Sequence, residues 1–100
     1  GPLFKMDNLI VNPAGSQGTR FLMVSVAVAT PSGEVAEQLR ADEAVIRDVV
    51  IALLERKSME MLALPGIRDS IKNQLSDTIS ALVGHSADKL KVYLPQFVIQ

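Results

Sequence analysis

The chain has 100 residues, of which 48% are hydrophobic and 21% charged, the size and composition of a single folded domain. Ten basic and eleven acidic residues leave a formal net charge of −1, so the chain lacks the basic surplus typical of nucleic-acid-binding proteins. It contains no cysteine, which excludes disulfides, thiol catalysis and zinc–thiolate sites. No apolar run approaches the roughly 20 residues of a membrane-spanning helix, and no secretion signal is visible.

Two strands are expected in the first third of the chain, at residues 8–12 and 20–29. The second is the longest β-prone apolar run, and both of its alternating sets of side chains are mostly apolar. The bulky set consists of Leu22, Val24, Val26 and Val28. A strand that is apolar on both sides is usually central in its sheet or covered on its second face. The polar loop 12–19, which we expect to be exposed, allows a hairpin between the two strands.

Three helices are expected in the middle of the chain. The first covers residues 34–40 with Ser32 as its N-cap, and the second covers residues 43–56 with Asp42 as its N-cap. The alternative is one continuous helix, because no strong breaker separates them. The third covers residues 66–83, and Gly84 follows as its C′ residue.

The apolar faces of these helices predict how they pack on the sheet. The face of the helix at 43–56 consists of Ile46, Val49, Val50, Leu53 and Leu54. The stripe of the helix at 66–83 consists of Ile67, Ile71, Leu75, Ile79 and Leu82, opposite a polar face of Asp69, Asn73, Ser76, Asp77 and Ser80. Ile51 falls off its apolar face, so we expect it to be exposed or in a second contact. Ser58 is expected to cap one further turn at residues 59–62, and Pro65 to lie in the first turn of the third helix.

Residues 90–99 are expected to form the final strand, paired with strand 20–29 in the same sheet. Pro95 interrupts this strand, which indicates an edge position or a bulge. The order β-β-α-α-α-β predicts an α+β fold for residues 1–100 as one domain. In this two-layer sandwich, the helices lie on one face of a small antiparallel or mixed sheet.

The sequence carries no recognisable catalytic or metal-binding pattern. The single histidine, His85, follows a helix-ending glycine, and a metal site needs three or four ligands, so a solvated turn histidine is the better interpretation. The carboxylate pairs lie in first helical turns, where the helix dipole accounts for them. No glycine-rich phosphate-binding motif occurs. We expect no enzyme activity and no cofactor; the alternative is a small ligand-binding α+β domain, recognisable by a deep pocket with converging polar groups.

The remaining candidates for function are contact residues. Five large apolar side chains have burial that the pattern does not guarantee: Phe21, Met23, Ile51, Tyr93 and Phe97. A small domain needs most such residues for its core, but aromatic residues and methionine are also enriched at protein interfaces. These five are therefore the predicted oligomer or partner contacts.

Three segments, in this order, resemble one known family. They are Leu9-Ile10-Val11-Asn12 with Arg20-Phe21-Leu22-Met23-Val24-Ser25-Val26, then Ile46 to Leu54 with Lys57-Ser58-Met59, and finally Val92-Tyr93-Leu94 with Gln96-Phe97-Val98-Ile99-Gln100. Together, over most of residues 3–100, they resemble the periplasmic domain of the flagellar basal-body-associated protein FliL. The chain departs from that family at Met23, where a basic or polar residue is frequent, and at Pro95-Gln96, which replaces Thr-Glu.

The resemblance implies a stomatin/prohibitin-like fold and a single N-terminal helix, absent from this chain, that anchors the protein in the bacterial inner membrane. It implies that this domain lies in the periplasm at the flagellar basal body. It further implies a non-catalytic motor accessory that associates with the stator units, supports torque, motility and swarming, and self-associates into rings. A stomatin-like membrane-associated scaffold unrelated to flagella is the alternative.

Overall fold

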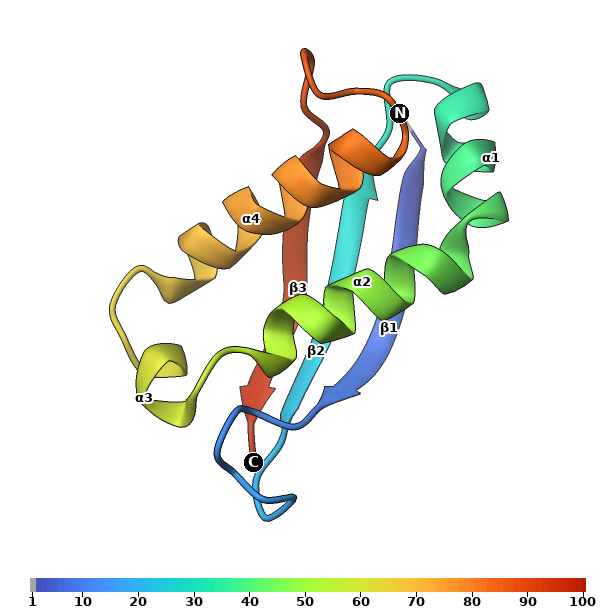
Figure 1. The fold of residues 1–100 in the computed structure, drawn as a ribbon. Helices are drawn as coiled ribbons and strands as arrows, with labels where there is room; N and C mark the ends of the chain where they lie inside the picture. The colour runs from blue at the N-terminus through green and yellow to red at the C-terminus, as the bar shows by residue number, and fades with distance from the viewer. Residues whose placement is uncertain (1) are drawn as a thin grey trace.

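The computed structural model describes residues 2–100, which form a three-stranded antiparallel sheet covered by helices (Figure 1). The strands β1 (Leu3–Val11), β2 (Leu22–Ala29) and β3 (Lys91–Ile99) lie in the order β1-β2-β3. The helices are α1 (Gly33–Ala41), α2 (Glu43–Glu55), α3 (Met59–Leu62) and α4 (Ile67–Leu82). The predicted α+β sandwich is confirmed, as is the pairing of the last strand with the central one. Within residues 2–100, no helix combines the length and apolar character needed to cross a bilayer.

The core lies on one side of the sheet, because the long helices all cover the same face (Figure 1). On β2, the side chains facing the helices are completely buried: Leu22, Val24, Val26 and Val28. The helices supply completely buried partners: Leu39, Ile46, Val50, Leu54, Ile71, Leu75 and Ile79. Each such side chain contributes about 1.5–3 kcal/mol when removed from water, so this single layer holds the fold together.

Strand β1 begins at Leu3, earlier than the sequence pattern predicted. Phe4 and Met6 alternate with exposed residues and are buried against the helices. A bulge between Met6 and Leu9, with Asn8 in the left-handed region (φ 56°), then shifts the alternation. Because of this shift, the burial of β1 does not alternate with a period of two along the whole strand. The sequence pattern therefore predicted only the second half of the strand.

Two of the predicted helix caps form, and one does not. The Oγ of Ser32 accepts a hydrogen bond from the Val35 N–H at 3.3 Å, and the Oγ of Ser58 accepts one from the Met61 N–H at 3.1 Å. Asp42 separates α1 from α2, so the helices are distinct, but its side chain makes no cap hydrogen bond. The predicted capping role of the Asp42 side chain is therefore wrong.

The ends of α4 were predicted with unequal success. The predicted place of Pro65 in the first turn is wrong, because α4 begins only after Gly66, which adopts the left-handed conformation (φ 78°). At the other end, Gly84 is the C′ residue as predicted (φ 75°). The N–H groups of Gly84 and His85 donate to the carbonyls of Ala81 and Ser80, which closes a Schellman motif.

The apolar stripe of α4 is buried as predicted at Ile71, Leu75 and Ile79 but departs from the prediction near its C-terminal end. Leu82 is exposed, whereas Ser80, predicted on the polar face, is completely buried. The reason is a hydrogen bond: the Ser80 Oγ accepts from the Leu90 N–H at 2.9 Å, and Ser76 Oγ donates to the Leu90 carbonyl. These two serines fasten the start of β3 to α4.

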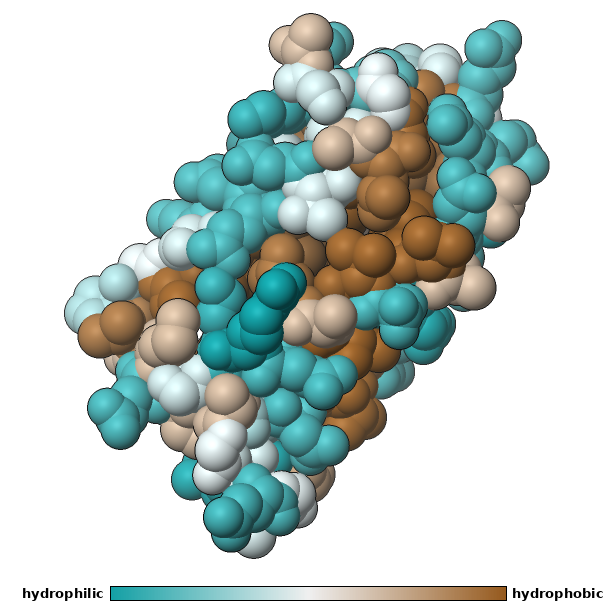
Figure 2. Space-filling view, in the orientation of Figure 1, coloured by the Kyte–Doolittle hydropathy of each residue, from teal (hydrophilic) through white to brown (hydrophobic). Residues whose placement is uncertain are grey.

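The helices also leave apolar surface uncovered. In α2, Val49 and Leu53 are only half-buried and Val45 is 55% exposed. Figure 2 shows apolar surface between α4 and α1 and over the first half of α2.

The loop between β1 and β2 is anchored to the helical layer. The Ala14 N–H donates to the Lys57 carbonyl at 2.9 Å, and Pro13 and Ser16 are buried. The prediction of an exposed loop is therefore correct only for part of residues 12–19.

Replacing Ser80 tests whether its hydrogen bond to Leu90 holds the start of β3 against α4. Ser80→Ala leaves the buried Leu90 N–H without its acceptor, so the free energy of unfolding should fall by about 1–3 kcal/mol in urea denaturation. Ser70→Ala is the matched control, because Ser70 is an exposed serine of the same helix and its replacement should change stability by no more than about 0.5 kcal/mol. Equal effects of the two substitutions would contradict the role given to Ser80.

Candidate interaction surface

The second face of the sheet carries no helix, and we call it the open face. Its side chains stand in rows across the strands, because residues opposite one another in the ladder point to the same side. The rows are Leu3–Ala29–Lys91, Lys5–Ala27–Tyr93, Ser25–Gln96 and Ile10–Met23–Val98. Four of these side chains are large, apolar and exposed: Leu3, Ile10, Tyr93 and Val98. Apolar residues gathered on one face of a small domain are typical of a surface that contacts another molecule.

A polar row divides the open face into two halves. The Ser25 Oγ accepts a hydrogen bond from the Asn8 N–H at 3.1 Å and donates one to the Gln96 Oε1 at 3.1 Å. Both edge strands bulge next to this row, β1 at Asn8 and β3 in the segment that contains Pro95. The bulge predicted from Pro95 is thus confirmed, and Ser25 satisfies a backbone group that the β1 bulge removes from the ladder.

One half of the open face is an apolar row formed by Ile10, Met23 and Val98. Ile10 is 49% exposed and Val98 is also exposed, while Met23 lies between them and is half-buried. No charged side chain belongs to this row. It is the most apolar strip of the open face.

The other half contains a hollow of about 620 Å³ that extends around the edge of β3 to α4. Lys5, Arg68 and Lys72 line it, and no carboxylate does. Its apolar lining consists of Leu3, Ala27, Tyr93, Leu94 and Pro95. We call this hollow the basic pocket.

Arg68 connects the basic pocket to the edge of the sheet. Its Nη2 donates to the Leu94 carbonyl at 2.9 Å, and its guanidinium lies 5.6 Å from the centre of the Phe97 ring. A guanidinium has five N–H donors, so this hydrogen bond leaves further donors for another molecule.

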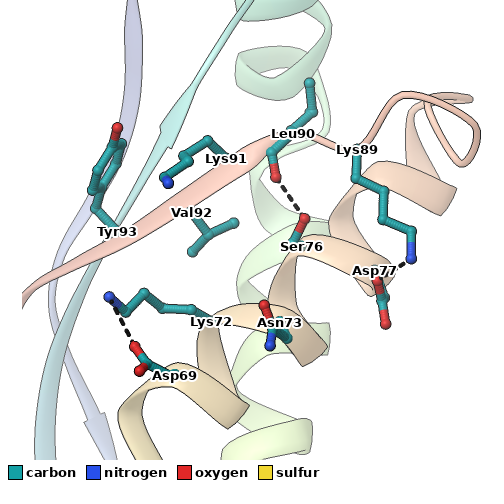
Figure 3. Close-up of a pocket in the computed structure, with 10 residues that line it drawn as sticks. All are labelled: Asp69, Lys72, Asn73, Ser76, Asp77, Lys89, Leu90, Lys91, Val92 and Tyr93. Carbon is teal, nitrogen blue, oxygen red and sulfur yellow. Dashed lines mark hydrogen bonds and ion pairs between the residues drawn. The ribbon is translucent and has the colours of Figure 1, made fainter.

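A neighbouring groove of about 850 Å³ runs between α4 and β3 and shares Lys72 and Tyr93 with the basic pocket (Figure 3). Lys72 and Lys91 both extend toward Tyr93 in this view, and the Lys91 ammonium lies 5.9 Å from the Tyr93 ring centre. The Lys72 ammonium also lies 3.4 Å from an Asp69 carboxylate oxygen, an exposed pair that gives little stability. Cations thus gather around one exposed tyrosine.

The structure distributes the five predicted contact residues over two sides of the sheet. Met23 and Tyr93 lie on the open face, and Phe21, half-buried and paired with Gln100 just before β2, alternates onto the same side. Ile51 and Phe97 are also half-buried, but they pack against the core on the helix side.

Sequence reasoning missed three exposed apolar residues of the open face: Leu3, Ile10 and Val98. It also missed the three cationic residues that line the basic pocket: Lys5, Arg68 and Lys72. Ile10 stands between two buried residues, so its alternation could have revealed it. The basic pocket had no such signal, because it joins β1, β3 and α4.

The arrangement offers contacts rather than chemistry. Within residues 2–100, no group of three or more histidine, cysteine, aspartate or glutamate side chains could hold a metal ion. His85 lies half-buried in the turn after α4. We assign no catalytic or cofactor-binding residue.

A pair of adjacent substitutions distinguishes the two faces of β2. Val24→Asp places a carboxylate in the dry core, at a cost comparable with the whole stability of about 5–15 kcal/mol, so this variant should not fold. Met23→Asp, on the open face, should cost only about 1–2 kcal/mol and keep the native circular dichroism spectrum. If Met23→Asp also unfolds the chain, the open face belongs to the core.

Comparison with known proteins adds a family to this geometry. The family model described as "Flagellar basal body-associated protein FliL" matches residues 3–100. The curated "Flagellar protein FliL" of Aquifex aeolicus (strain VF5) is 27% identical over 101 residues, and the match covers the whole of this chain. The chain spans 62% of the length of that relative.

Proposed function

Because the chain belongs to the flagellar basal body-associated FliL family, we propose that it is a non-catalytic accessory domain of the flagellar motor. The family match over residues 3–100 is the single observation that carries this function. The structure supports a role through contacts, since the open face presents exposed apolar side chains and a polar row that keeps the two halves of that face distinct.

In this role the domain self-associates and contacts the stator units, which supports torque generation, swimming and swarming. The apolar row of Ile10, Met23 and Val98 is suited to a protein partner, because a small apolar centre surrounded by polar groups is the usual anatomy of an interface. Of the five predicted contact residues, Phe21, Met23 and Tyr93 are accordingly proposed as contacts on this face.

The domain works in the periplasm, attached to the inner membrane through a helix outside this chain. Tethering beside the basal body raises the effective concentration of each copy, so that even a weak interface is occupied. A family described as basal body-associated fits this location.

Catalysis is not part of the proposed role. In the larger groove, the Ser76 hydroxyl donates to the Leu90 carbonyl rather than to a general base. Lys72 and Lys89 there lie within salt-bridge distance of Asp69 and Asp77. Such paired side chains are typical of a solvated surface.

Motility of the host bacterium tests the function. Deleting the gene should reduce swimming speed and swarm expansion while flagellar filaments still assemble. Complementation with the full-length gene carrying Ile10→Lys and Val98→Lys should fail to restore motility, because two charges then occupy the apolar row.

Leu64→Lys is the matched control for these substitutions. Leu64 is 56% exposed, close to the 49% of Ile10, but it lies in the turn before α4, away from the open face. The control should restore motility fully. Unchanged motility in the deletion strain would refute the proposed function, and equal behaviour of control and test variants would refute the role of the apolar row.

A further inference from the structure

The groove between α4 and β3 contains backbone groups of the sheet that no other part of residues 2–100 uses. We propose that this groove binds a short extended peptide segment of a partner protein, which forms backbone hydrogen bonds with Val92. The groove of about 850 Å³ has one wall on α4, from Asp69 to Asp77, and the other along residues 89–93 (Figure 3). It lies at the edge of the sheet, so it is a second surface besides the open face.

The hydrogen bonds on either side of Val92 show where its backbone points. Leu90 directs its N–H and carbonyl to two serines of α4, and the Leu94 carbonyl accepts from Arg68. The backbone groups of successive strand residues point to alternate sides, so residues 90, 92 and 94 share one direction. The N–H and carbonyl of Val92 therefore point away from β2 and toward the groove.

These two groups of Val92 have no partner in the part of the chain that the structure describes. None of the side chains of α4 within residues 2–100 forms a hydrogen bond with them, although α4 binds the backbone of both Leu90 and Leu94. Val92 is only 4% exposed, so water also has little access to it. Folded proteins rarely leave a buried donor and acceptor unpaired. A bound molecule that supplies one acceptor and one donor would satisfy both groups.

An extended peptide has these two groups at the required spacing. In an antiparallel ladder, two residues that face each other exchange a pair of hydrogen bonds through the N–H and carbonyl of each. Addition of an extended segment to a free strand edge is a common way in which proteins bind peptides. One residue of the segment would thus pair with Val92 in the way that the strands of the sheet pair with one another.

The hydrogen bonds of α4 limit the length of the segment. The edge from Leu90 to Leu94 is about 13 Å long, and three extended residues span about 10 Å. A strand of ordinary length, about 17–20 Å, would collide with the serines and with Arg68 that bind the two ends of this edge. The groove is therefore suited to a short segment rather than to the edge of a second sheet.

The surroundings of the groove indicate which side chains the segment carries. The residue opposite Val92 directs its side chain toward α4, where Asn73 and Ser76 are polar. In an antiparallel segment, the preceding residue lies beside Tyr93 and the following residue beside Lys91. Tyr93 is 44% exposed, and Lys91 forms no ion pair within residues 2–100. An apolar, a polar and an acidic residue in this order match the three positions.

The backbone contributes more to this recognition than the charges of the groove do. Two of its three lysines lie in ion pairs, Lys72 with Asp69 at 3.4 Å and Lys89 with Asp77 at 2.6 Å, so the charges largely cancel. A small free anion would therefore gain little there. Lys72 and Lys91 lie on either side of Val92 in Figure 3, and their flexible stems allow them to move aside for a segment.

Titration of the nitrogen-15-labelled chain with acetyl-Leu-Thr-Glu-amide, followed by nuclear magnetic resonance, tests the proposal. The Val92 amide proton should shift downfield and saturate in the millimolar range, because a new acceptor reaches it. The same peptide with an N-methyl group on threonine cannot donate to the Val92 carbonyl, so it should bind at least about tenfold more weakly. The reversed peptide, acetyl-Glu-Thr-Leu-amide, has the same composition and should bind severalfold more weakly.

A pair of substitutions on α4 locates the binding in the groove. Asn73→Trp places a large ring between α4 and β3, so it should weaken binding of acetyl-Leu-Thr-Glu-amide severalfold. Ser70→Trp is the matched control, because Ser70 is an exposed residue of the same helix that does not line the groove. The control should bind the peptide like the unmodified chain.

Four results would overturn the proposal. These are a Val92 amide that shows no saturable shift, equal binding of the N-methylated peptide, equal binding by the two tryptophan variants, or a Val92 shift that follows the concentration of the chain alone. The last result would assign the groove to a second copy of the chain. None of these titrations depends on motility, so their failure is distinguishable from failure of the proposed flagellar role.

Discussion

The structure depends on one constraint: a three-stranded sheet buries its central strand from one side only. Leu22, Val24, Val26 and Val28 are completely covered by α1, α2 and α4, and this layer supplies the hydrophobic core. No helix remains for the other face. That face must then tolerate water, which it does with small residues on β2, the hydrogen-bonded Ser25 and a mixture of lysines and apolar side chains at its edges.

The same constraint shapes the β3 edge of the sheet, around which the basic pocket extends. β3 is an edge strand, and an unpaired edge invites another strand to add to it. Here α4 takes up some of these groups: Ser80 and Ser76 hydrogen-bond to the N–H and carbonyl of Leu90, just before β3, and Arg68 to the carbonyl of Leu94. Arg68 therefore serves both to bind a backbone carbonyl at the edge of the strand and to line the basic pocket.

Much of this fold was predictable because hydrophobic periodicity reports burial directly. The alternation in β2 identified the core row, and Ser32, Ser58 and Gly84 marked helix ends through local hydrogen bonding that the sequence specifies. The errors arose where distant residues intervene. Ser80 is buried because it binds the backbone of Leu90, and the basic pocket exists because the fold brings Lys5 of β1 and Lys72 of α4, far apart in sequence, to the lining of one hollow. Ile51 and Phe97 were contact candidates because the sequence pattern does not guarantee their burial; both are half-buried and pack against the core.

The central claim is that the domain acts through its open face. Hydroxyl-radical footprinting of the full-length protein in its native membrane, compared with the isolated chain, tests this most directly. Labelling of Ile10 and Tyr93 should fall in the assembled protein, whereas labelling of Leu64, equally exposed but in the turn before α4, should stay the same. If Ile10 and Tyr93 are labelled equally in both forms, the open face contacts nothing and the account is wrong.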